Sequence, residues 1–484
     1  MSFLGSDWEG KIYLNGWTDG SGAPIQVTEP ATGERLGTLG SASPHDVANA
    51  AGLAAAAQES WQAVPPSERA AILRKAGSLW EQHAGEIHDW IIRETGAIPP
   101  KAALETAIAA QECYEAAALP SHPMGDVLPS NEPRWSFARR RPAGVVSVIA
   151  PFNFPLILSI RSVAPALALG NAVLLKPDPR TAVSGGVTLV EVFRAVGLPD
   201  GLLQLLPGGR ETGEATITAS QVRVVSFTGS TTAGRAVGAL AAKHLKRAHL
   251  ELGGNNALIV LPGADLTKAV SAGAFGSFMH QGQICMATGR HVVHESLHDS
   301  YVDALAATAD HLPVGNPAAA QVALGPIIDK SQLDKVDGIV QQAVDSGARL
   351  AAGGTYEGLF YRPTVLAEVR QDMAAWHEEI FGPVAPVLPF GTVEEAIKIA
   401  RDAEYGLSLG ILGDVGQAMQ LADAIPSGIV HINEQTVSDE ANAPFGGIAA
   451  SGTGSRAGGA LANIDAFTET QWLTVRPDIA PYPF

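Results

Sequence analysis

The chain has little cysteine and few basic residues for its length. Two cysteines in 484 residues cannot form a disulfide framework, so a reducing compartment is expected. They also cannot supply four metal-binding thiolates, and we expect no metal site. Lys and Arg total 32 against 49 Asp and Glu, a formal net charge of −17. A net anion of this size disfavours nonspecific binding to nucleic acid or to anionic membranes, so neither is expected as a partner.

Long uninterrupted hydrophobic runs are also missing. The longest apolar region, Phe154 to Gly170, is broken by Pro155, Arg161 and Pro165, which argues against a membrane span. The opening residues, MSFLGSDWEGK, carry acidic residues early and no basic segment before an apolar run, unlike a signal peptide. We therefore expect a cytoplasmic protein.

What the sequence does contain, from Gly144 onwards, is an alternation of short apolar runs and helical segments. Runs rich in Val, Leu and Ile predict buried strands, and segments of 10–16 residues between them predict helices at 155–169, 181–196 and 231–242. This order predicts a parallel, doubly wound α/β sheet, which binds ligands at the carboxyl ends of its strands. The predicted strands are GVVSVIAP, AVLLK, LLQLLP, VRVVSF, AHLELGG and ALIVL.

A second α/β stretch is expected from Asp265 to about Asn433. Helices are predicted near 266–280, 297–311, 329–347 and 393–402, and strands at RHVVH, PVAPVLPF and GIVHIN. The segment from Met124 to Gly144 predicts an exposed hairpin, and the tail predicts one more strand. Exposed strands are usually covered, and a partner subunit is a reasonable candidate. Upstream, 44–64, 66–96 and 99–119 predict packing helices that hold no chemical motif.

Two residues in this frame are candidates for catalysis. Cys285, in FMHQGQICMATGR, is preceded by Gly282 and followed by small residues, so the peptide is expected to bend and present free N–H groups. The alternative is a small buried core residue. Glu251, in HLELGGNNALIV, ends a strand between apolar runs, where desolvation would raise the pKa of a general base. The alternative is a capping or salt-bridged glutamate.

Three further features follow strands. FTGSTTAG, starting at Phe227, opens a helix whose N-terminus could bind a phosphate, although its spacing is not the usual G-x-G-x-x-G. Asn153 could donate to an oxyanion or simply form an Asx turn before Pro155. Lys176 becomes a nucleotide-binding candidate only if a nucleotide lies beside it. The Gly-rich segment from Ser451 to Gly459 follows no clear strand and is interpreted as a loop.

Together, and in this order, these motifs resemble the NAD(P)-dependent aldehyde dehydrogenases over nearly the whole chain. Cys285 follows Glu251 by 34 residues, the spacing typical of that family. The segment HINEQTVSDEANAPFGG and the tail are most similar to the benzaldehyde, salicylaldehyde and vanillin dehydrogenase branch. The motifs that carry the resemblance are PFNFP, LLKP, FTGSTTAG, ELGGNNALIV, GQICMATGR, EEIFGPV and PFGGIAASGTG.

The resemblance implies a fold of two doubly wound parallel-sheet domains with a small β oligomerisation element. It places the NAD(P)-binding domain at 1–123 and 144–251, the catalytic domain at 252–450, and oligomerisation strands at 124–143 and 466–484. It also implies a homodimer or homotetramer.

The resemblance further implies that Cys285 attacks the aldehyde carbon, that Asn153 and the Cys285 N–H hold the oxyanion, and that Glu251 activates water. The cofactor would be NAD or NADP, with NAD the default expectation. Its binding residues would be Ile149, Pro151, Lys176, Gly209, Gly229, Ser230, Gly234, Leu252, Glu379 and Phe381. The substrate pocket would be formed by Phe154, Arg161, Met286 and Thr436.

Two positions suggest how this chain differs from other members. Arg161 stands where the family often has an aromatic residue, and its side chain would either extend to the surface or reach a ring hydroxyl of the substrate. Pro179 stands where strongly NAD-selective members have a glutamate that repels a 2′-phosphate. Asp178 could replace that glutamate, Arg180 could bind the phosphate, or both could be solvated loop charges.

Four alternatives stay open at this point. An aliphatic or broad-specificity aldehyde dehydrogenase would use the same machinery. A CoA-acylating aldehyde dehydrogenase lacks the glutamate at the position of Glu251, so its presence favours hydrolysis. An inactive binding protein is disfavoured because the catalytic residues are intact. A Cys–His thiol hydrolase would have to use His280, with no orienting Asn or Asp evident.

Overall fold

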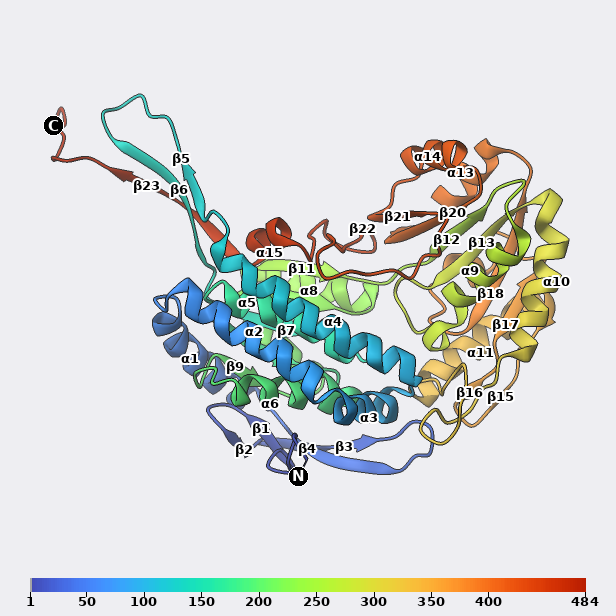
Figure 1. Ribbon diagram of the computed structural model, residues 1–484, viewed down its shortest axis with the longest axis horizontal. Helices are drawn as coiled ribbons and strands as arrows, with labels where there is room; N and C mark the ends of the chain where they lie inside the picture. The colour runs from blue at the N-terminus through green and yellow to red at the C-terminus, as the bar shows by residue number, and fades with distance from the viewer. Residues whose placement is uncertain (1) are drawn as a thin grey trace.

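The structure is a computed structural model that describes residues 2–484. Figure 1 shows two α/β lobes side by side and a thin β arm that projects from the first lobe. The first lobe contains a seven-stranded sheet in the order β11-β10-β7-β8-β9-β1-β2. Its parallel strands are β7 (Val145–Ile149), β8 (Ala172–Lys176), β9 (Leu203–Leu205), β10 (Val222–Thr228) and β11 (Arg247–Glu251), and β1 (Lys11–Tyr13) and β2 (Trp17–Asp19) extend the sheet antiparallel. The predicted parallel α/β sheet is confirmed for five of its six predicted strands, whereas the sixth, ALIVL, belongs to the sheet of the second lobe.

Helices cover this sheet and begin where the sequence supplies starting signals. Proline, whose missing N–H costs nothing in a first turn, opens four of them: α1 (Pro44–Trp61), α2 (Pro66–Gln82), α4 (Pro99–Ala118) and α5 (Pro155–Ala168). Ser43 and Asp46 add a capping box to α1. The other helices of the lobe are α3 (Ala84–Thr95), α6 (Thr188–Ala195), α7 (Arg210–Thr218) and α8 (Thr231–Lys243). Helix α4 packs against α2 and α5 and so reaches the carboxyl end of β7.

One predicted helix differs from its expectation. The segment 181–196 was expected to be a single helix, but a π-helical turn at Val183–Val187 precedes α6. The reason lies in α3, because the buried carboxylate of Glu94 accepts from the main-chain N–H groups of Val183, at 3.0 Å, and Ser184, at 2.6 Å. A distant carboxylate therefore sets the local backbone. Helix α7 was not predicted at all.

The second lobe repeats the architecture. Its sheet has the order β14-β17-β18-β13-β12-β20-β21, parallel except for the β14 and β17 pair. The strands are β12 (Asn256–Val260), β13 (Thr288–His294), β14 (Arg349–Ala352), β17 (Thr364–Ala367), β18 (Val384–Phe390), β20 (Ser408–Leu412) and β21 (Ile429–Ile432). The helices are α9 (Leu266–Phe278), α10 (Glu295–His311), α11 (Lys330–Asp345), α12 (Ala374–His377), α13 (Val393–Arg401) and α14 (Val415–Ala424). The first sheet ends at Glu251 and the second begins at Asn256.

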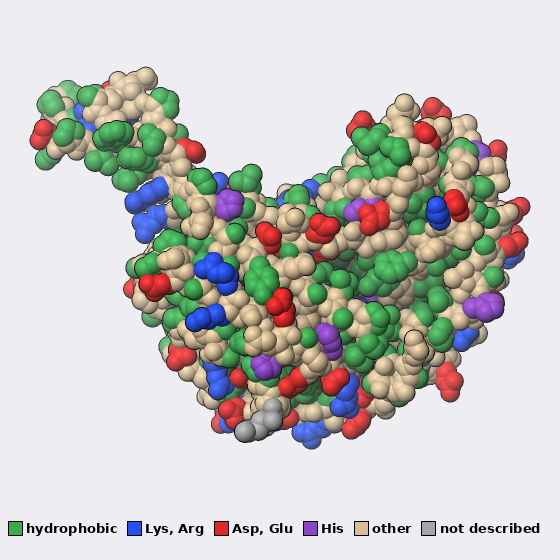
Figure 2. Space-filling view, viewed as in Figure 1, with side chains coloured by type: hydrophobic (Ala, Val, Ile, Leu, Met, Phe, Trp, Pro, Cys, Tyr) green, Lys and Arg blue, Asp and Glu red, His purple; other side chains and the backbone are tan. Residues whose placement is uncertain are grey.

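The projecting arm is an antiparallel sheet of β23 (Thr468–Val475), β6 (Trp135–Pro142) and β5 (Gly125–Val127). Both predicted segments, the hairpin and the tail strand, therefore form strands. Figure 2 shows hydrophobic side chains gathered on the arm, and Trp135 and Trp472 are both more than half exposed there. Helix α15 (Ala460–Phe467) leads into β23. Smaller pairs are β3 (Gly22–Thr28) with β4 (Arg35–Ser41), β15 (Tyr356–Glu357) with β16 (Phe360–Tyr361), and β19 (Tyr405–Gly406) with β22 (Ile448–Ala449).

Within residues 2–484, none of the helices combines the length and the apolar character needed to cross a bilayer.

Candidate functional site

Cys285 lies between the two lobes, in the loop that leads from α9 to β13. The bend before it uses left-handed backbone at His280 and Gln281, with φ of 48° and 58°. Gly282 also has a positive φ, and a Cβ there would collide with the carbonyl of Gly382, so this position requires glycine. Burial, together with the negative charges of Glu379 and Glu251, raises the pKa of the Cys285 thiol to about 12.

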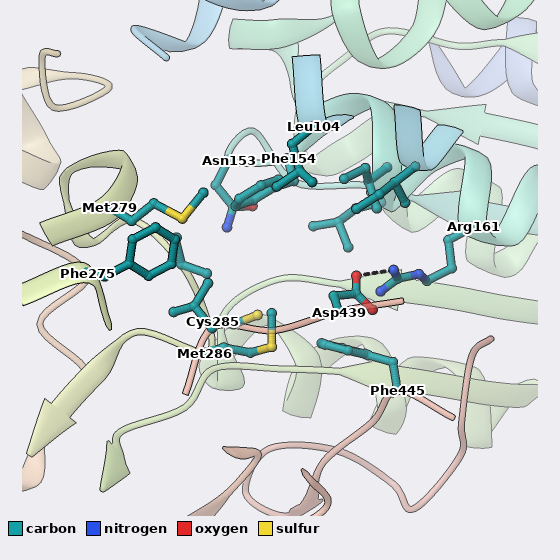
Figure 3. A pocket seen from close by; sticks show the side chains of 15 residues that line it. Leu104, Asn153, Phe154, Arg161, Phe275, Met279, Cys285, Met286, Asp439 and Phe445 are labelled. Carbon is teal, nitrogen blue, oxygen red and sulfur yellow. Dashed lines mark hydrogen bonds and ion pairs between the residues drawn. The ribbon is translucent and has the colours of Figure 1, made fainter. Parts of the chain in front are cut away.

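Two cavities share Cys285 as a lining residue. The first, which we call the apolar cavity, has a volume of about 600 Å³ and is drawn in Figure 3. Leu104 and Ile108 of α4, together with Phe154, Phe275, Met279, Ile284, Met286, Val437 and Phe445, form most of its wall. Its polar members are Asn153, Arg161, Cys285 and Asp439. A cavity of this composition suits a flat, apolar ligand held by a few polar contacts.

Asn153 lies in the loop between β7 and α5 and lines the apolar cavity with Cys285. One side-chain N–H donates to the carbonyl oxygen of Gln283 at 2.9 Å, which leaves the second N–H without a partner among residues 2–484. The main-chain N–H of Cys285 is also free of hydrogen bonds within the described chain. The structure therefore leaves both predicted oxyanion donors, the Asn153 side chain and the Cys285 N–H, free to bind a ligand in the same cavity.

The carbonyl of Asn153 is held by a residue that the sequence analysis missed. Lys101 of α4, fully buried, donates its ammonium to this oxygen at 2.7 Å and pairs with Glu105 one turn further on. Glu105 in turn accepts from the N–H of Leu156 in the first turn of α5, at 3.1 Å. The same ammonium lies 4.3 Å from the ring centroid of Phe154. A pair of charges at i and i+4 in the sequence was the available signal.

Arg161 does not extend to the surface, and that interpretation was wrong. Its side chain is 5 % exposed and pairs with Glu112 of α4, at 3.1 Å, and with Asp439. Figure 3 shows Arg161 and Asp439 facing each other at the wall of the apolar cavity. The attraction of the two carboxylates raises the pKa of the guanidinium, and burial raises that of Glu112 to about 7. Asp439, which the sequence analysis did not single out, is therefore part of the cavity's polar wall.

The three other predicted pocket residues differ in outcome. Met286 lines the apolar cavity as expected, and so does Phe154. Thr436 was expected to line the pocket but does not. It is fully buried behind the wall, where its hydroxyl donates to the carbonyl of Met286 at 2.7 Å. The next residue, Val437, lines the cavity instead, because that hydroxyl is committed to Met286.

The second cavity, which we call the nucleotide cleft, has a volume of about 1030 Å³ and opens at the carboxyl ends of the first sheet. A neighbouring pocket continues it past Gly209 and shares Lys176 and Ser230 with it. Gly234 does not line the cleft. It makes room for Leu252, since a Cβ on Gly234 would lie 2.2 Å from a methyl carbon of that leucine. Eight predicted cofactor residues do line the cleft: Ile149, Pro151, Lys176, Gly229, Ser230, Leu252, Glu379 and Phe381.

The groups in the nucleotide cleft suit a dinucleotide. Ser230 caps α8, a thirteen-residue helix whose first turn presents free N–H groups and a positive dipole end to an anion. The Glu379 carboxylate can accept hydrogen bonds from hydroxyl groups. It accepts one from the N–H of Gly254 at 3.0 Å, and burial raises its pKa to about 7. A Cβ on Gly253 would displace this carboxylate, so the glycine leaves Glu379 its place in the cleft. Burial lowers the pKa of the Lys176 ammonium.

Asp178 and Arg180 are not independent solvated charges. The guanidinium of Arg180 donates to Asp178 at 2.8 Å and to Asp329 of the second lobe at 2.5 Å, and it lies over the Phe152 ring. Hydrogen bonds and the charge of Arg180 lower the pKa of Asp178. All of these residues except Asp329 line the nucleotide cleft. The negative charge of Asp178 is thus neutralised inside the cleft.

Glu251 ends β11, where the sequence predicted a strand end. Burial raises the pKa of its carboxyl to about 8, and one oxygen accepts from the N–H of Gly447 at 3.3 Å. It lines neither cavity that Cys285 lines but a third, which we call the rear cavity. The rear cavity shares Leu158, Arg161 and Phe445 with the apolar cavity, so the base lies behind its wall. The loop 451–459 packs here through a bridge between Gly452 and Glu251.

His280 gives no support to a Cys–His hydrolase. It is buried, and neither ring nitrogen has a hydrogen-bond partner among residues 2–484. Burial and the nearby Lys101 hold its pKa well below the ordinary value, so the ring is neutral, and no Asn or Asp side chain of the described residues bonds to it as a catalytic base would need. The described residues also contain no cluster of His, Cys, Asp and Glu suited to a metal ion.

Comparison with known proteins agrees with this geometry. The chain matches the Aldehyde dehydrogenase family over residues 17–473. It is 64 % identical to a vanillin dehydrogenase of an Amycolatopsis species, over 100 % of both chains. It is 47 % identical to the benzaldehyde dehydrogenase [NAD(+)] of Pseudomonas putida, over 99 % of this chain and 98 % of that one. A salicylaldehyde dehydrogenase from Pseudomonas putida G7, solved with salicylaldehyde, superposes with a TM-score of 0.94 at 36 % identity, covering 98 % and 99 % of the two chains. The chain belongs to the aldehyde dehydrogenase family.

Proposed function

We propose that this enzyme oxidises aromatic aldehydes to carboxylic acids with a nicotinamide dinucleotide, through a covalent intermediate on Cys285. The observation that carries the proposal is the position of this sulfur, where the apolar cavity and the nucleotide cleft meet. An aldehyde and a dinucleotide in these two cavities would each reach the same sulfur. That is the arrangement a hydride transfer from a cysteine-bound substrate needs.

Cys285 acts first. Its thiol passes its proton to water in the adjoining cavities, and the thiolate sulfur then forms a bond to the aldehyde carbon, whose carbonyl oxygen becomes an oxyanion. The free side-chain N–H of Asn153 and the main-chain N–H of Cys285 stabilise this charge by donating to it. Lys101 fixes the main chain of Asn153, so the donor is already in place when the charge develops.

The nucleotide cleft holds the cofactor beside this intermediate. A bound NAD or NADP would supply the hydride acceptor, and Cys285 would then carry the acyl group as a thioester. Glu379 and Lys176 are the groups suited to ribose hydroxyls, and the N-terminus of α8 at Gly229 and Ser230 suits the pyrophosphate. Phe381 limits the cleft on the remaining side and meets Phe152 edge to face, with ring centroids 5.9 Å apart.

Glu251 then acts as the general base. A carboxyl with a pKa of about 8 is a proton acceptor matched to neutral and mildly alkaline pH. It takes a proton from water, the water oxygen bonds to the thioester carbon, and the C–S bond breaks to release the acid. The presence of this base supports hydrolysis over transfer of the acyl group to CoA.

The substrate class follows from the apolar cavity. Its wall is mostly aromatic and aliphatic. Within that wall, the Arg161–Asp439 pair places one hydrogen-bond donor and one acceptor. Such a pair can bind a ring hydroxyl or methoxyl group. The vanillin, benzaldehyde and salicylaldehyde dehydrogenases named above support an aromatic substrate, and the first and last of them support a ring substituent. The relative named for NAD(+) supports NAD as the preferred cofactor.

A homo-oligomer in the cytoplasm completes the proposal. The arm carries exposed tryptophans, Trp135 and Trp472, and presents strand edges that a second copy of the chain would cover. Both cysteines are unpaired, which suits a reducing compartment. Sedimentation of the purified protein would separate a dimer from a tetramer.

The direct test is a panel of aldehydes with the purified enzyme and NAD, without CoA. We expect NADH formation with vanillin, salicylaldehyde and benzaldehyde at kcat/KM values at least about tenfold above that for hexanal. Equal values for hexanal would favour a broad-specificity enzyme. A strict requirement for CoA would contradict hydrolysis by Glu251.

A further inference from the structure

The rear cavity is lined by several polar groups. Ser162 of α5 and Ser226 of β10 bring their hydroxyls together at 2.8 Å on one side of it. Glu251 and His249 lie on the same face of β11, because residues i and i+2 of a strand point the same way. Arg456 of the loop 451–459 completes this lining. The cavity therefore surrounds the proposed base with hydrogen-bonding groups.

The rear cavity borders a pocket at the surface. A pocket of about 1030 Å³ on the outside of the first lobe shares His249, Ser455 and Arg456 with it. Arg140 and Asp465 stand at the rim of this outer pocket, where the side chain of Asp465 is 70 % exposed. None of the residues of the outer pocket lines the apolar cavity or the nucleotide cleft. The shared residues therefore lie between the cavity of Glu251 and the surface, and we call this region, from Glu251 past His249 to the outer pocket, the rear passage.

His249 stands in the middle of this passage with a defined tautomer. Its Nε2 lies 3.1 Å from the carbonyl oxygen of Ala466, and a carbonyl can only accept, so Nε2 carries the hydrogen. Nδ1 is then a lone-pair acceptor, and it is buried without a partner among residues 2–484. A buried acceptor is costly unless water satisfies it, and the rear cavity has room for about one water molecule with several polar partners.

We infer that the rear passage delivers water to Glu251 and carries its proton to solvent, with His249 Nδ1 and the Ser162–Ser226 pair positioning the water. This inference rests on the proposed function, since it concerns the hydrolysis step. There the water oxygen bonds to the acyl carbon, the electron pair of the C–S bond stays on Cys285, and one water proton goes to the Glu251 carboxylate. That proton must leave before the next turnover, while product and cofactor still fill the other two cavities.

His249 is a positioning residue in this scheme and not the proton carrier. Burial and the neighbouring Arg247 lower its pKa to about 4, whereas that of Glu251 is raised to about 8. A proton moving from the Glu251 acid to the imidazole would go uphill, so it passes along water. The charged groups that face His249 are Arg247, beside it on β11, Asp465 on α15 and Arg456 on the loop.

The test separates acylation from hydrolysis with p-nitrophenyl benzoate, an activated ester that acylates a thiolate without any cofactor. Wild type should release a burst of about one equivalent of p-nitrophenol and then a steady rate set by hydrolysis. His249→Phe, which removes the acceptor and fills the passage, should keep the burst and lower the steady rate by at least about tenfold. His249→Asn, which restores a polar group near Nδ1, should recover the rate to within about threefold of wild type.

His244→Asn is the matched control, because His244 is exposed at the end of α8 and lines none of these cavities. Ser162→Ala removes one hydroxyl without adding bulk. If His249→Phe does not fold, the steady rate of Ser162→Ala is measured in its place and should be lowered. An unchanged steady rate in His249→Phe, or in Ser162→Ala in its place, would overturn the inference. Absence of any burst in the wild-type enzyme would instead overturn the proposed role of Cys285, so the two failures are distinguishable.

Discussion

The ammonium of Lys101 donates to the main-chain carbonyl of Asn153 at 2.7 Å, inside the protein and out of contact with water. Through this one bond, helix α4 holds the residue whose side chain faces the Cys285 sulfur. Glu105 balances the charge of Lys101 and also accepts from the first turn of α5. The buried Lys101–Glu105 ion pair therefore holds the main chain of Asn153, the predicted oxyanion donor, in place.

Breaking that pair should cost both stability and rate. Lys101→Met leaves the Glu105 carboxylate buried without its partner, a loss of about 3–5 kcal/mol in the free energy of unfolding. Denaturant unfolding measures it. The double variant Lys101→Met/Glu105→Gln should lose less than the sum of the two single variants, because no lone charge remains. In Lys101→Met and in the double variant, kcat should fall by a larger factor than KM rises. An unchanged kcat would contradict a positioning role for Lys101.

Replacing the nucleophile should abolish turnover. Cys285→Ala removes the sulfur at which the two cavities meet, and the other cysteine, Cys113, is buried in α4. We expect NADH formation to fall by at least about a thousandfold. Binding of NAD, measured by calorimetry, should persist and so shows that the variant is folded. Residual turnover within about tenfold of wild type would rule out Cys285 as the nucleophile.

Replacing the base should stop the cycle halfway. Glu251→Gln keeps the shape but accepts no proton, so acylation survives and hydrolysis fails, giving an NADH burst of about one equivalent followed by a slow phase. The carboxyl is active when ionised, and its pKa is raised to about 8. The wild-type hydrolysis rate should therefore rise with pH through about 8, and this rise should be missing in the variant. A normal steady state would show that another group activates the water.

Arg161 should determine which aromatic aldehydes are preferred. Its removal leaves Glu112 unpaired, so the informative variant is Arg161→Leu combined with Glu112→Gln. A hydrogen bond to a charged group contributes about 1.5–3 kcal/mol, so kcat/KM for vanillin and salicylaldehyde should fall about tenfold or more relative to benzaldehyde. Benzaldehyde, which has no ring hydroxyl, is the internal control. Equal losses on all three substrates would exclude a role in specificity.

The cofactor preference should be modest. Pro179 offers no charge against a 2′-phosphate, and Asp178 is neutralised by Arg180. We expect the kcat/KM ratio of NAD to NADP to stay below about a thousandfold, or 4 kcal/mol. Arg180→Ala frees the Asp178 carboxylate and should increase the ratio, whereas Asp178→Ala should decrease it. A wild-type ratio above a thousandfold in favour of NAD would mean that Asp178 repels the phosphate despite its partner.

The sequence predicted well the features that depend on residues close together in the chain. The strand at Ala172–Lys176 matches its prediction at both ends, because a short run of Val and Leu between a glycine turn and a proline leaves no other choice. Cys285 and Glu251 stood out because their motifs are short and the surrounding residues are small. Their roles in the reaction stay predictions until the variants above are measured.

The rest depends on contacts between segments far apart in the chain. Helix α4 was expected only to pack, yet Lys101, Glu105 and Glu112 are buried on it because their partners come from α5 and from the loop at Asn153 before it. The π-helical turn before α6 depends on Glu94, roughly ninety residues away in sequence. Thr436 was placed in the pocket one residue too early, and no periodicity distinguishes it from Val437.

The separate mouths of the two cavities that meet at Cys285 have a consequence for the order of events. Leu104 and Phe275 are partly exposed at the entrance of the apolar cavity, whereas Ser230 and Lys335 are exposed at the nucleotide cleft. The acid therefore departs past one set of residues and the reduced dinucleotide past another, so neither product blocks the exit of the other. Inhibition by the acid should accordingly be competitive against the aldehyde and not against the dinucleotide.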